Sequence, residues 1–300
     1  MGGINKKIWK EAEDLILDFQ NNVFFKNRYF VKHKLLDYIK HISEVCCINV
    51  NEGNIYYRAR IYNNPSSSFN YEKYEALTKL EVSPEKKKQL DALEKSRADA
   101  LNESRMENPF LGYSESNSFV PPNNLSIGDG RANPSMIKYL YTAESQYTAM
   151  AEVRPFLHDK VSIAEIRVEN SLVICDLSMY QNEKLLEIEK YLLLKIMFMF
   201  STPINNDSRD YIPTQYISEY IKNLGFDGIR FNSSLHSGGK NITVYNYDKC
   251  RAVSSVLYEI NDICFDARPI TPRNILPLMH TRLLPDLKLK LKEMLEKENK

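Results

Sequence analysis

The stretch from 130 to 155 constrains the fold of this chain most, because it joins a polar turn, an apolar run and an acidic helix without a linker. Gly130 and Pro134 enclose the turn, and these residue types set the backbone shape of a turn before any ligand binds. The turn carries the polar side chains of Arg131 and Asn133. We interpret this unit as the centre of an active site.

The strand and the helix of this unit follow from spacing. Residues 137–141 form a compact β-prone run that predicts a strand. From Glu144 the spacing becomes helical, and the helix must end near Arg154 because the residue before a proline is disfavoured in the α region. Glu152 lies in the last turn of this helix. Its neighbours three and four positions back are small, which leaves room for a ligand beside the carboxylate.

Composition and charge exclude several classes of protein. The chain has 300 residues, of which 43% are hydrophobic, so it can bury a substantial core. Its 40 basic and 39 acidic residues nearly cancel, which gives no global attraction to nucleic acid or to an anionic membrane. Five cysteines without a CxxC pair favour a reducing compartment, and no apolar run is long enough to span a bilayer. We expect a soluble cytoplasmic protein without nucleic-acid or membrane partners.

The first 50 residues predict a helical N-terminal unit. Apolar residues follow helical spacing over 8–19 and again over 31–42, on either side of a polar break at 20–22. Such a unit is too small to fold alone. We expect its apolar stripes to pack on the main body or on a partner, and a homodimer stays open.

Residues 51–266 form the expected main domain. After a turn at Gly53, a strand carries Arg58 and Arg60, whose side chains point to one face because they lie two residues apart. From about residue 70 to residue 108, a charged and mostly solvated helical insertion is expected.

Further strands and helices complete the chain. Two strands rich in Val and Ile meet at 169–171, and a largely buried helix follows over 183–200. A second helix over 211–224 is closed by Gly225 in a left-handed conformation. The segments FDGIRFNSS and NITVYNY predict two more strands, and an edge strand follows residue 250. A proline-spaced linker and a last helix make up residues 267–300. These elements predict a mixed α+β protein.

The candidate site residues are polar residues at strand ends and in loops. None of the five histidines has metal-ligand spacing to another, and GxGxxG, P-loop and GxSxG motifs are missing, so we expect no metal site. His236, which lies close to two glycines, is expected to be a solvated loop residue. Arginines with a single glutamate suit a ligand that carries phosphates and a centre that becomes cationic. The candidates are Arg58, Arg60, Arg131, Tyr141, Glu152, Ser233 and Ser234.

Several sequence blocks in one order resemble the RES domain family, which is named for an Arg, a Glu and a Ser. They are YRAR at 57–60, GRANP with LYTA, the helix ending in AEVRP, then YIPTQYISEYIKNLGFDGIRFNSS and GGKNITVY. The resemblance covers 56–247. The sequence departs from the family pattern in two places, because the helical insertion interrupts the usual short path to GRANP and the N-terminal unit lies outside the resemblance.

The resemblance implies a fold similar to ADP-ribosyltransferases, with a split mixed sheet around a cleft, and NAD⁺ as substrate with no further cofactor. Many family members are toxins of toxin–antitoxin pairs that deplete NAD⁺, so an antitoxin or activator protein is an expected partner. The family residues fall on Arg58, Tyr141, Glu152 and Ser233, with Ser234 as an alternative serine. We expect these side chains to converge on the cleft.

A mechanism agrees with both the residues and the resemblance. Cleavage of the nicotinamide–ribose bond passes through an oxocarbenium-like state, and the leaving group already carries positive charge, so one carboxylate suffices. Glu152 would stabilise the cation or position water, and Arg58 would hold the diphosphate. Tyr141 would stack near nicotinamide, and Ser233 would fix the ribose or orient Arg58. The further substrate-binding candidates are Arg60, Arg131, Asn133 and Ser234.

Three functions stay open. The first is an NAD⁺ glycohydrolase or phosphorylase that acts as a toxin or defence effector. The second is an ADP-ribosyltransferase that modifies a protein or small molecule, because another nucleophile can trap the same cation. The third is a catalytically silent nucleotide-binding module, and the presence of all four family residues weighs against it.

Overall fold

A computed structural model describes residues 5–62, 95–96, 99, 101–121, 127–202 and 208–264. The C-terminal helix expected within 267–300 lies outside the described residues, as does most of the expected insertion. Of that insertion, 101–107 form a helix. Arg105 Nη2 joins it to the body by donating to Glu165 Oε2 at 3.0 Å and to Ser254 Oγ at 3.0 Å.

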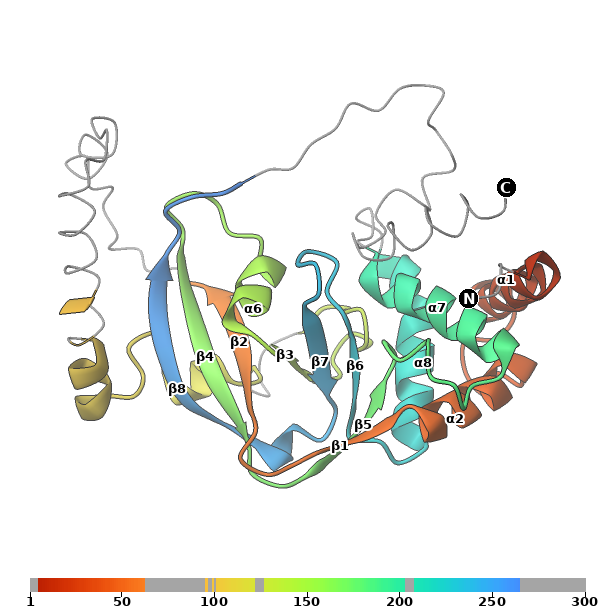
Figure 1. The fold of residues 1–300 in the computed structure, drawn as a ribbon, viewed down its shortest axis with the longest axis horizontal. Helices are drawn as coiled ribbons and strands as arrows, with labels where there is room; N and C mark the ends of the chain where they lie inside the picture. Colours follow the sequence, from red (N-terminus) through yellow and green to blue (C-terminus); the bar gives the residue numbers. More distant parts are fainter. Residues whose placement is uncertain are drawn as a thin grey trace.

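One eight-stranded mixed sheet forms the body of the molecule (Figure 1). The strands lie in the order β1-β5-β6-β7-β3-β2-β4-β8. The pair β5 and β6 is parallel, and the other neighbours are antiparallel. The expected mixed α+β class is therefore confirmed. The strands are β1 (Cys47–Val50), β2 (Ile55–Ile61), β3 (Leu140–Ala143), β4 (Lys160–Val168), β5 (Leu172–Asp176), β6 (Gly228–Asn232), β7 (Lys240–Val244) and β8 (Cys250–Glu259).

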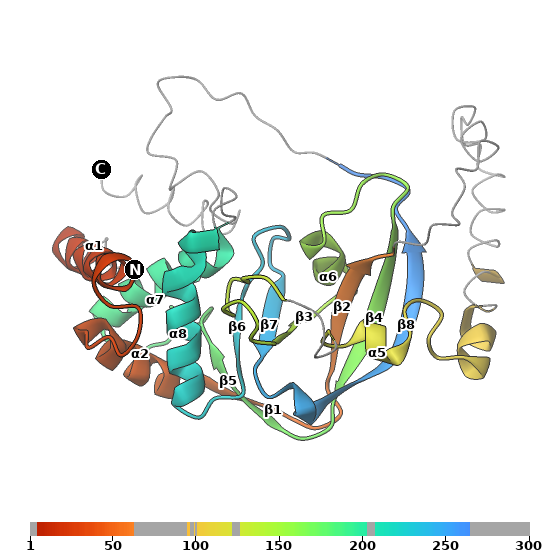
Figure 2. The same ribbon diagram turned by 180° about the vertical axis from the view of Figure 1, so that it is seen from behind.

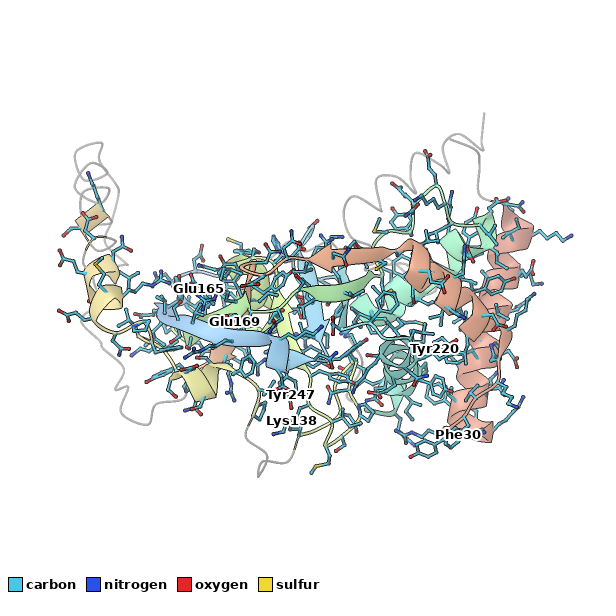
Figure 3. The ribbon with its side chains drawn as sticks, turned by 90° about the horizontal axis from the view of Figure 1, so that it is seen from below. Phe30, Lys138, Glu165, Glu169, Tyr220 and Tyr247 are labelled. Carbon is cyan, nitrogen blue, oxygen red and sulfur yellow. The ribbon has the colours of Figure 1, made fainter. Side chains whose placement is uncertain are left out.

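The helices divide between the two halves of the sheet (Figures 1 and 2). Four of them gather beside β5 and β6: α1 (Lys6–Asn21), α2 (Lys34–Val45), α7 (Glu187–Ser201) and α8 (Ile212–Asn223). α5 (Glu115–Ser118) contacts β4 and β8, and α6 (Gln146–Glu152) contacts β2 and β3. Figure 3 shows the same division, with Glu165 and Glu169 on the sheet half and Tyr220 and Phe30 on the helical half. No described helix is long and apolar enough to cross a bilayer.

The sheet splits between β2 and β3. These strands share only the residue pair Tyr57↔Ala143, whereas β2 pairs with β4 from Ile55 to Ile61. A continuous antiparallel ladder would next pair residue 59 with residue 141, so the two strands lose their ladder hydrogen bonds beyond this point. We call this opening the β2–β3 fork.

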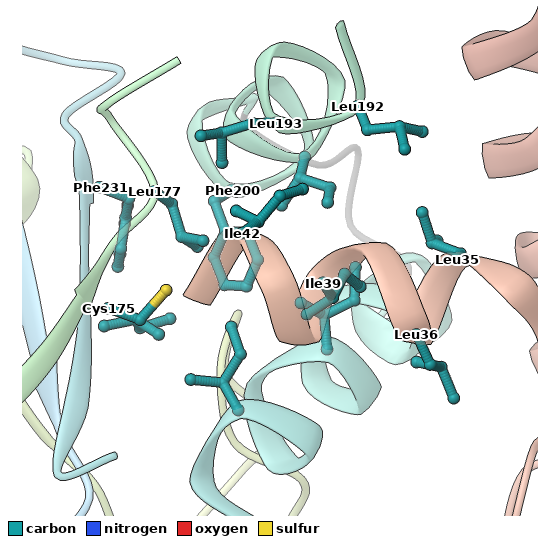
Figure 4. Close-up of a cluster of buried hydrophobic side chains, with 14 of the residues drawn as sticks. Leu35, Leu36, Ile39, Ile42, Cys175, Leu177, Leu192, Leu193, Phe200 and Phe231 are labelled. Carbon is teal, nitrogen blue, oxygen red and sulfur yellow. The ribbon is translucent and has the colours of Figure 1, made fainter. Parts of the chain in front are cut away.

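The N-terminal helices share one hydrophobic core with α7 and α8. Figure 4 shows Ile42 of α2, Phe200 of α7 and Phe231 of β6 in this cluster. A polar contact joins the same elements, because His41 Nδ1 of α2 lies 2.8 Å from Glu189 Oε1 of α7. The helical unit therefore packs on the main body. α1 contributes Ala12, Ile16 and Phe19 to this core.

The first α-helix ends at Asn21, within the predicted polar break at 20–22, and a π-helical turn over Asn22–Lys26 follows it. Asn22 Nδ2 donates to Asp18 O at 2.8 Å and so supports the helix end. The helix predicted from residue 183 begins at Glu187, where Leu186 N donates to Glu189 Oε2 at 2.8 Å as a cap. Gly225 has the expected left-handed backbone, with φ +96°.

Substitutions of two phenylalanines test whether α1 belongs to the cooperative core. Phe19 is fully buried, whereas Phe25 is 82% exposed. Phe19→Ala should lower the free energy of unfolding by about 3–5 kcal/mol, because it leaves a cavity. The matched control, Phe25→Ala, should change it by less than about 0.5 kcal/mol. Urea unfolding of both full-length variants measures the difference, and equal stabilities would show that α1 does not stabilise the core.

Candidate functional site

Glu152 is exposed at the C-terminal end of α6. The helix begins after Ser145, whose Oγ accepts a hydrogen bond from Thr148 N at 3.1 Å. It ends at Glu152, and two residues later Arg154 adopts a left-handed φ of +49° before Pro155. The carboxylate therefore projects from a helix end toward β7 and the loop over 233–239.

Two donors converge on one oxygen of Glu152. Ser233 Oγ donates to Glu152 Oε1 at 2.6 Å, and Asn241 Nδ2 donates to the same oxygen at 2.7 Å. Ser233 is fully buried, and its Oγ also accepts from Leu235 N and His236 N at 3.2 and 3.1 Å. These two N–H groups occupy the acceptor sites of the hydroxyl and direct its proton to Glu152. Among the described residues, no donor engages Glu152 Oε2.

This geometry distinguishes the two adjacent serines. Ser233 contacts Glu152, whereas Ser234 has no side-chain hydrogen bond within the described part of the chain. Of the two alternative serines, Ser233 is therefore the one that contacts Glu152.

The loop that carries Ser233 is fixed to α6 at a second point. His236 Nδ1 lies 2.7 Å from Thr148 Oγ1, and its ring centre lies 4.7 Å from that of Tyr147. The prediction that His236 is a solvated loop residue is thus wrong, because α6 supplies it with a hydroxyl and an aromatic ring. Gly239 permits the close approach, since a Cβ there would lie 2.7 Å from both His236 Nδ1 and Thr148 Oγ1.

Tyr141 connects β3 to the turn before it. Its hydroxyl donates to Asn133 Oδ1 at 2.7 Å and accepts from Ala132 N at 3.0 Å. Burial raises the pKa of Tyr141, so the side chain is a neutral phenol at pH 7. Both contacts hold the ring in one orientation.

Arg58 lies in the β2–β3 fork. Its Nη1 donates to Tyr141 O at 3.3 Å, where a continuous ladder would have supplied a backbone partner. Its Nε is buried without a hydrogen-bond partner, and no described carboxylate forms an ion pair with it. Burial, followed by the charge of Arg60, lowers the pKa of Arg58 to about 10, which still leaves it cationic at pH 7. A half-buried cation whose buried Nε–H is unused is a candidate site for an anion.

The other two candidate arginines are occupied within the protein. Arg60 Nη1 donates to Asn117 O, and its guanidinium carbon lies 5.5 Å from the ring centre of Tyr113. Arg131 Nη1 donates to Thr202 O at 2.9 Å at the C-terminal end of α7, where a cation is favoured by the helix dipole. Both arginines thus have backbone partners within the protein, and their predicted roles in substrate binding stay predictions.

Asn133 shapes the turn before β3. It is 3% exposed, its Oδ1 accepts from Tyr141, and its Nδ2 donates to Pro134 O and Ile137 O at 3.0 and 2.9 Å. Both ends of the amide thus have partners within the protein, and the predicted contact of Asn133 with substrate stays a prediction. The contact with Ile137 O also explains why β3 begins at Leu140 and not at residue 137 as predicted.

Sequence reasoning missed the residues of α8 that hold this turn. Gln215 Nε2 donates to Gly130 O and to Asn133 O, both at 3.0 Å. Thr214 Oγ1 donates to Arg131 O at 2.7 Å. The available sequence signal was that Thr214 and Gln215 are adjacent polar residues near the start of α8, which is otherwise amphipathic. Asn241 was missed as well, although it is a polar residue within a strand-forming run.

The two parts of the predicted site meet at β3. Ala143 pairs with Asn241 on one side and with Tyr57 on the other. Glu152 is thus anchored on the β7 side of β3, and Arg58 lies on the β2 side. Within the described residues no hydrogen bond joins Arg58 to Glu152, so their action on one ligand stays a prediction. No group of three His, Cys, Asp or Glu among these residues is suited to hold a metal ion.

Comparisons with known proteins give a family match. The RES domain model matches residues 107–266, which include Tyr141, Glu152 and Ser233, while Arg58 precedes the matched range. No curated protein matches the chain. Among solved structures, a chain of the M. tuberculosis MbcT–MbcA toxin–antitoxin complex aligns with a TM-score of 0.36 and 13% sequence identity. The alignment covers 74% of this chain and 92% of that chain.

Two glycines in the turn before β3 test how tightly Tyr141 is held. A Cβ on Gly130 would overlap Asn133 Oδ1 and lie 2.7 Å from the Tyr141 hydroxyl, whereas a Cβ on Gly128 would meet nothing within 4 Å. Gly130→Ala should therefore lower the free energy of unfolding by about 1–3 kcal/mol through overpacking. Gly128→Ala is the matched control and should be nearly neutral. Denaturant unfolding of both variants checks this, and a Gly130→Ala protein as stable as the parent would contradict the packing described.

Proposed function

The chain belongs to the RES domain family, and from this premise we propose that it cleaves the nicotinamide–ribose bond of NAD⁺ as a toxin or defence effector. The observation that carries the proposal is the exposed Glu152 carboxylate, whose Oε1 is held by Ser233 and Asn241 while Oε2 has no described partner. A negative charge held in one position, with one oxygen available, suits a cationic transition state.

The proposed reaction needs one carboxylate and no acid. The bond between ribose C1′ and the nicotinamide nitrogen breaks, and its electron pair leaves with nicotinamide, which departs neutral. The ribose becomes oxocarbenium-like, and Glu152 stabilises this cation. A nucleophile then bonds to C1′ and releases its proton to solvent.

Arg58 is the proposed anchor for the diphosphate of NAD⁺. It is a half-buried cation without a described carboxylate partner, and its buried Nε–H is unused. Charge-assisted hydrogen bonds to phosphate would satisfy that donor. Tyr141, with its hydroxyl fixed by the turn, would present its ring to the nicotinamide end.

The acceptor of the ADP-ribosyl group separates the remaining alternatives. Purified full-length protein incubated with NAD⁺ would release nicotinamide and free ADP-ribose if water is the acceptor, or a phosphorylated ADP-ribose if phosphate is. Transfer of label from NAD⁺ to a protein would identify an ADP-ribosyltransferase. Binding of NAD⁺ without release of nicotinamide would support the silent binding module and contradict the proposal.

Glu152→Gln tests the charge directly, because it keeps the size of the side chain and removes its charge. Nicotinamide release should fall by about 10²-fold or more, while NAD⁺ binding survives. The matched control is Glu169→Gln, which alters a carboxylate paired with Arg167 elsewhere on the sheet. That variant should act at the parental rate. Release at the parental rate by Glu152→Gln would refute the mechanism.

Arg58→Ala should weaken binding more than it slows the chemical step, since the proposed contact with the diphosphate exists before and during bond cleavage. We expect KM to rise with a smaller change in kcat. Arg167→Ala, which removes an arginine paired with Glu169, is the matched control and should leave KM unchanged. An unaltered KM in Arg58→Ala would exclude Arg58 from NAD⁺ binding.

A further inference from the structure

We propose that Asn241 is a positioning residue that determines which oxygen of Glu152 faces the substrate. The inference rests on the proposed function and goes beyond the Arg, Tyr, Glu and Ser assignments. Asn241 Nδ2 donates to Glu152 Oε1 at 2.7 Å, and Ser233 Oγ donates to the same atom at 2.6 Å. Both short contacts are charge-assisted, so they favour a single rotamer of Glu152. Oε2 is then the oxygen that remains for the substrate.

Asn241 lies in a strand that is paired on both sides, whereas Glu152 lies at an exposed helix end. Asn241 lies within β7 and is paired with Ala143 of β3 and with Phe231 of β6, so its backbone is fixed on both sides. Glu152 is the exposed last residue of α6, which is only seven residues long. A free glutamate side chain at such a place would occupy several rotamers. The hydrogen bond from β7 therefore restricts the rotamers of the Glu152 side chain, which the end of α6 alone would not restrict.

The orientation of the Asn241 amide follows from the same contact. Its Oδ1 is buried and has no hydrogen-bond partner. The opposite orientation would place Oδ1 against Glu152 Oε1, and two acceptors would repel each other. An unsatisfied buried oxygen lowers the stability of the folded protein. The amide is thus held in an orientation that disfavours stability and provides a donor to Glu152.

Ser233 and Asn241 act as a pair on Oε1. Ser233 belongs to a loop that His236 and Thr148 fix to α6, so its position follows α6. Asn241 belongs to the sheet. Because Asn241 pairs with Ala143 of β3, it relates the carboxylate directly to the strand that carries Tyr141, whose backbone oxygen accepts from Arg58 of β2.

Asn241→Leu removes the donor with little change in volume and tests the proposal. We expect kcat for nicotinamide release to fall by about 10–10²-fold, because a small displacement of a reacting group has an effect of this size. KM should change little, since Arg58 is untouched. Stability should be maintained, because the variant also removes a buried unsatisfied oxygen. A parental kcat, or a loss of activity that only follows a loss of folded protein, would overturn the proposal.

Asn241→Asp provides a second test through the pH dependence of activity, which a purely structural role of Asn241 would not change. Two carboxylates at hydrogen-bond distance raise the pKa of the pair, so one proton binds between them as the pH falls. That proton restores a donor to Glu152. The activity of Asn241→Asp relative to the parent should therefore rise as the pH is lowered from about 8 to about 5. A constant ratio across this range would contradict the positioning role.

Thr243→Val is the matched control on the same strand. It removes a buried hydroxyl that has no hydrogen-bond partner and contacts neither Glu152 nor Ser233. It should leave kcat unchanged, which would show that β7 tolerates substitution. A kcat as low as that of Asn241→Leu would contradict a specific role for Asn241.

A crystal structure of full-length Asn241→Leu tests the position of Glu152 directly, without relying on the proposed reaction. If positioning is correct, Glu152 will leave the Oε1 position or occupy several rotamers, even if the parent protein does not cleave NAD⁺. An unmoved Glu152 that is still bound to Ser233 would overturn the positioning role. An NAD⁺-inactive parent with a displaced Glu152 in the variant would refute the proposed function alone.

Discussion

The hydrogen bonds that Ser233 and Asn241 donate to one oxygen of Glu152 tie together three parts of the chain: α6, the loop after β6, and β7. A charged oxygen at a helix end is well solvated and would otherwise move freely. Two short donors, one of them from a fully buried serine, restrict it without burying the carboxylate. The result is a charge that is both exposed and oriented, which electrostatic stabilisation of a transition state requires.

β3 relates this carboxylate to the rest of the site. It is only four residues long, yet it pairs with β7 along its length and meets β2 at one residue pair. Because the ladder to β2 stops there, Tyr141 O is free to accept from Arg58, and the guanidinium occupies the β2–β3 fork. The turn before β3 fixes the hydroxyl of Tyr141, and Gln215 of α8 holds that turn. The helical half, including α1 and α2 through the shared core, thereby supports the position of Tyr141.

Local signals predicted a large part of this arrangement. Pro155 and helical spacing placed Glu152 in the last turn of a helix, and alternation placed Arg58 on a strand. The sequence could not identify Asn241 as the partner of Glu152, because 89 residues separate them and the contact depends on strand order. It could not reveal the contact of Arg131 with the end of α7 for a similar reason, because a cation in a turn suits a phosphate and a helix end equally well. Asn133 likewise looked available because its Nδ2 partners are backbone groups, which carry no sequence signal.

The central claim is that Glu152 and Arg58, on the two sides of β3, act on one molecule of NAD⁺. A crystal structure of the Glu152→Gln protein with NAD⁺ tests it most directly, because the variant should bind the intact dinucleotide without cleaving it. Our account predicts the nicotinamide ribose beside Gln at position 152 and the diphosphate beside Arg58. NAD⁺ bound away from either residue, or with its diphosphate held by other side chains, would contradict it.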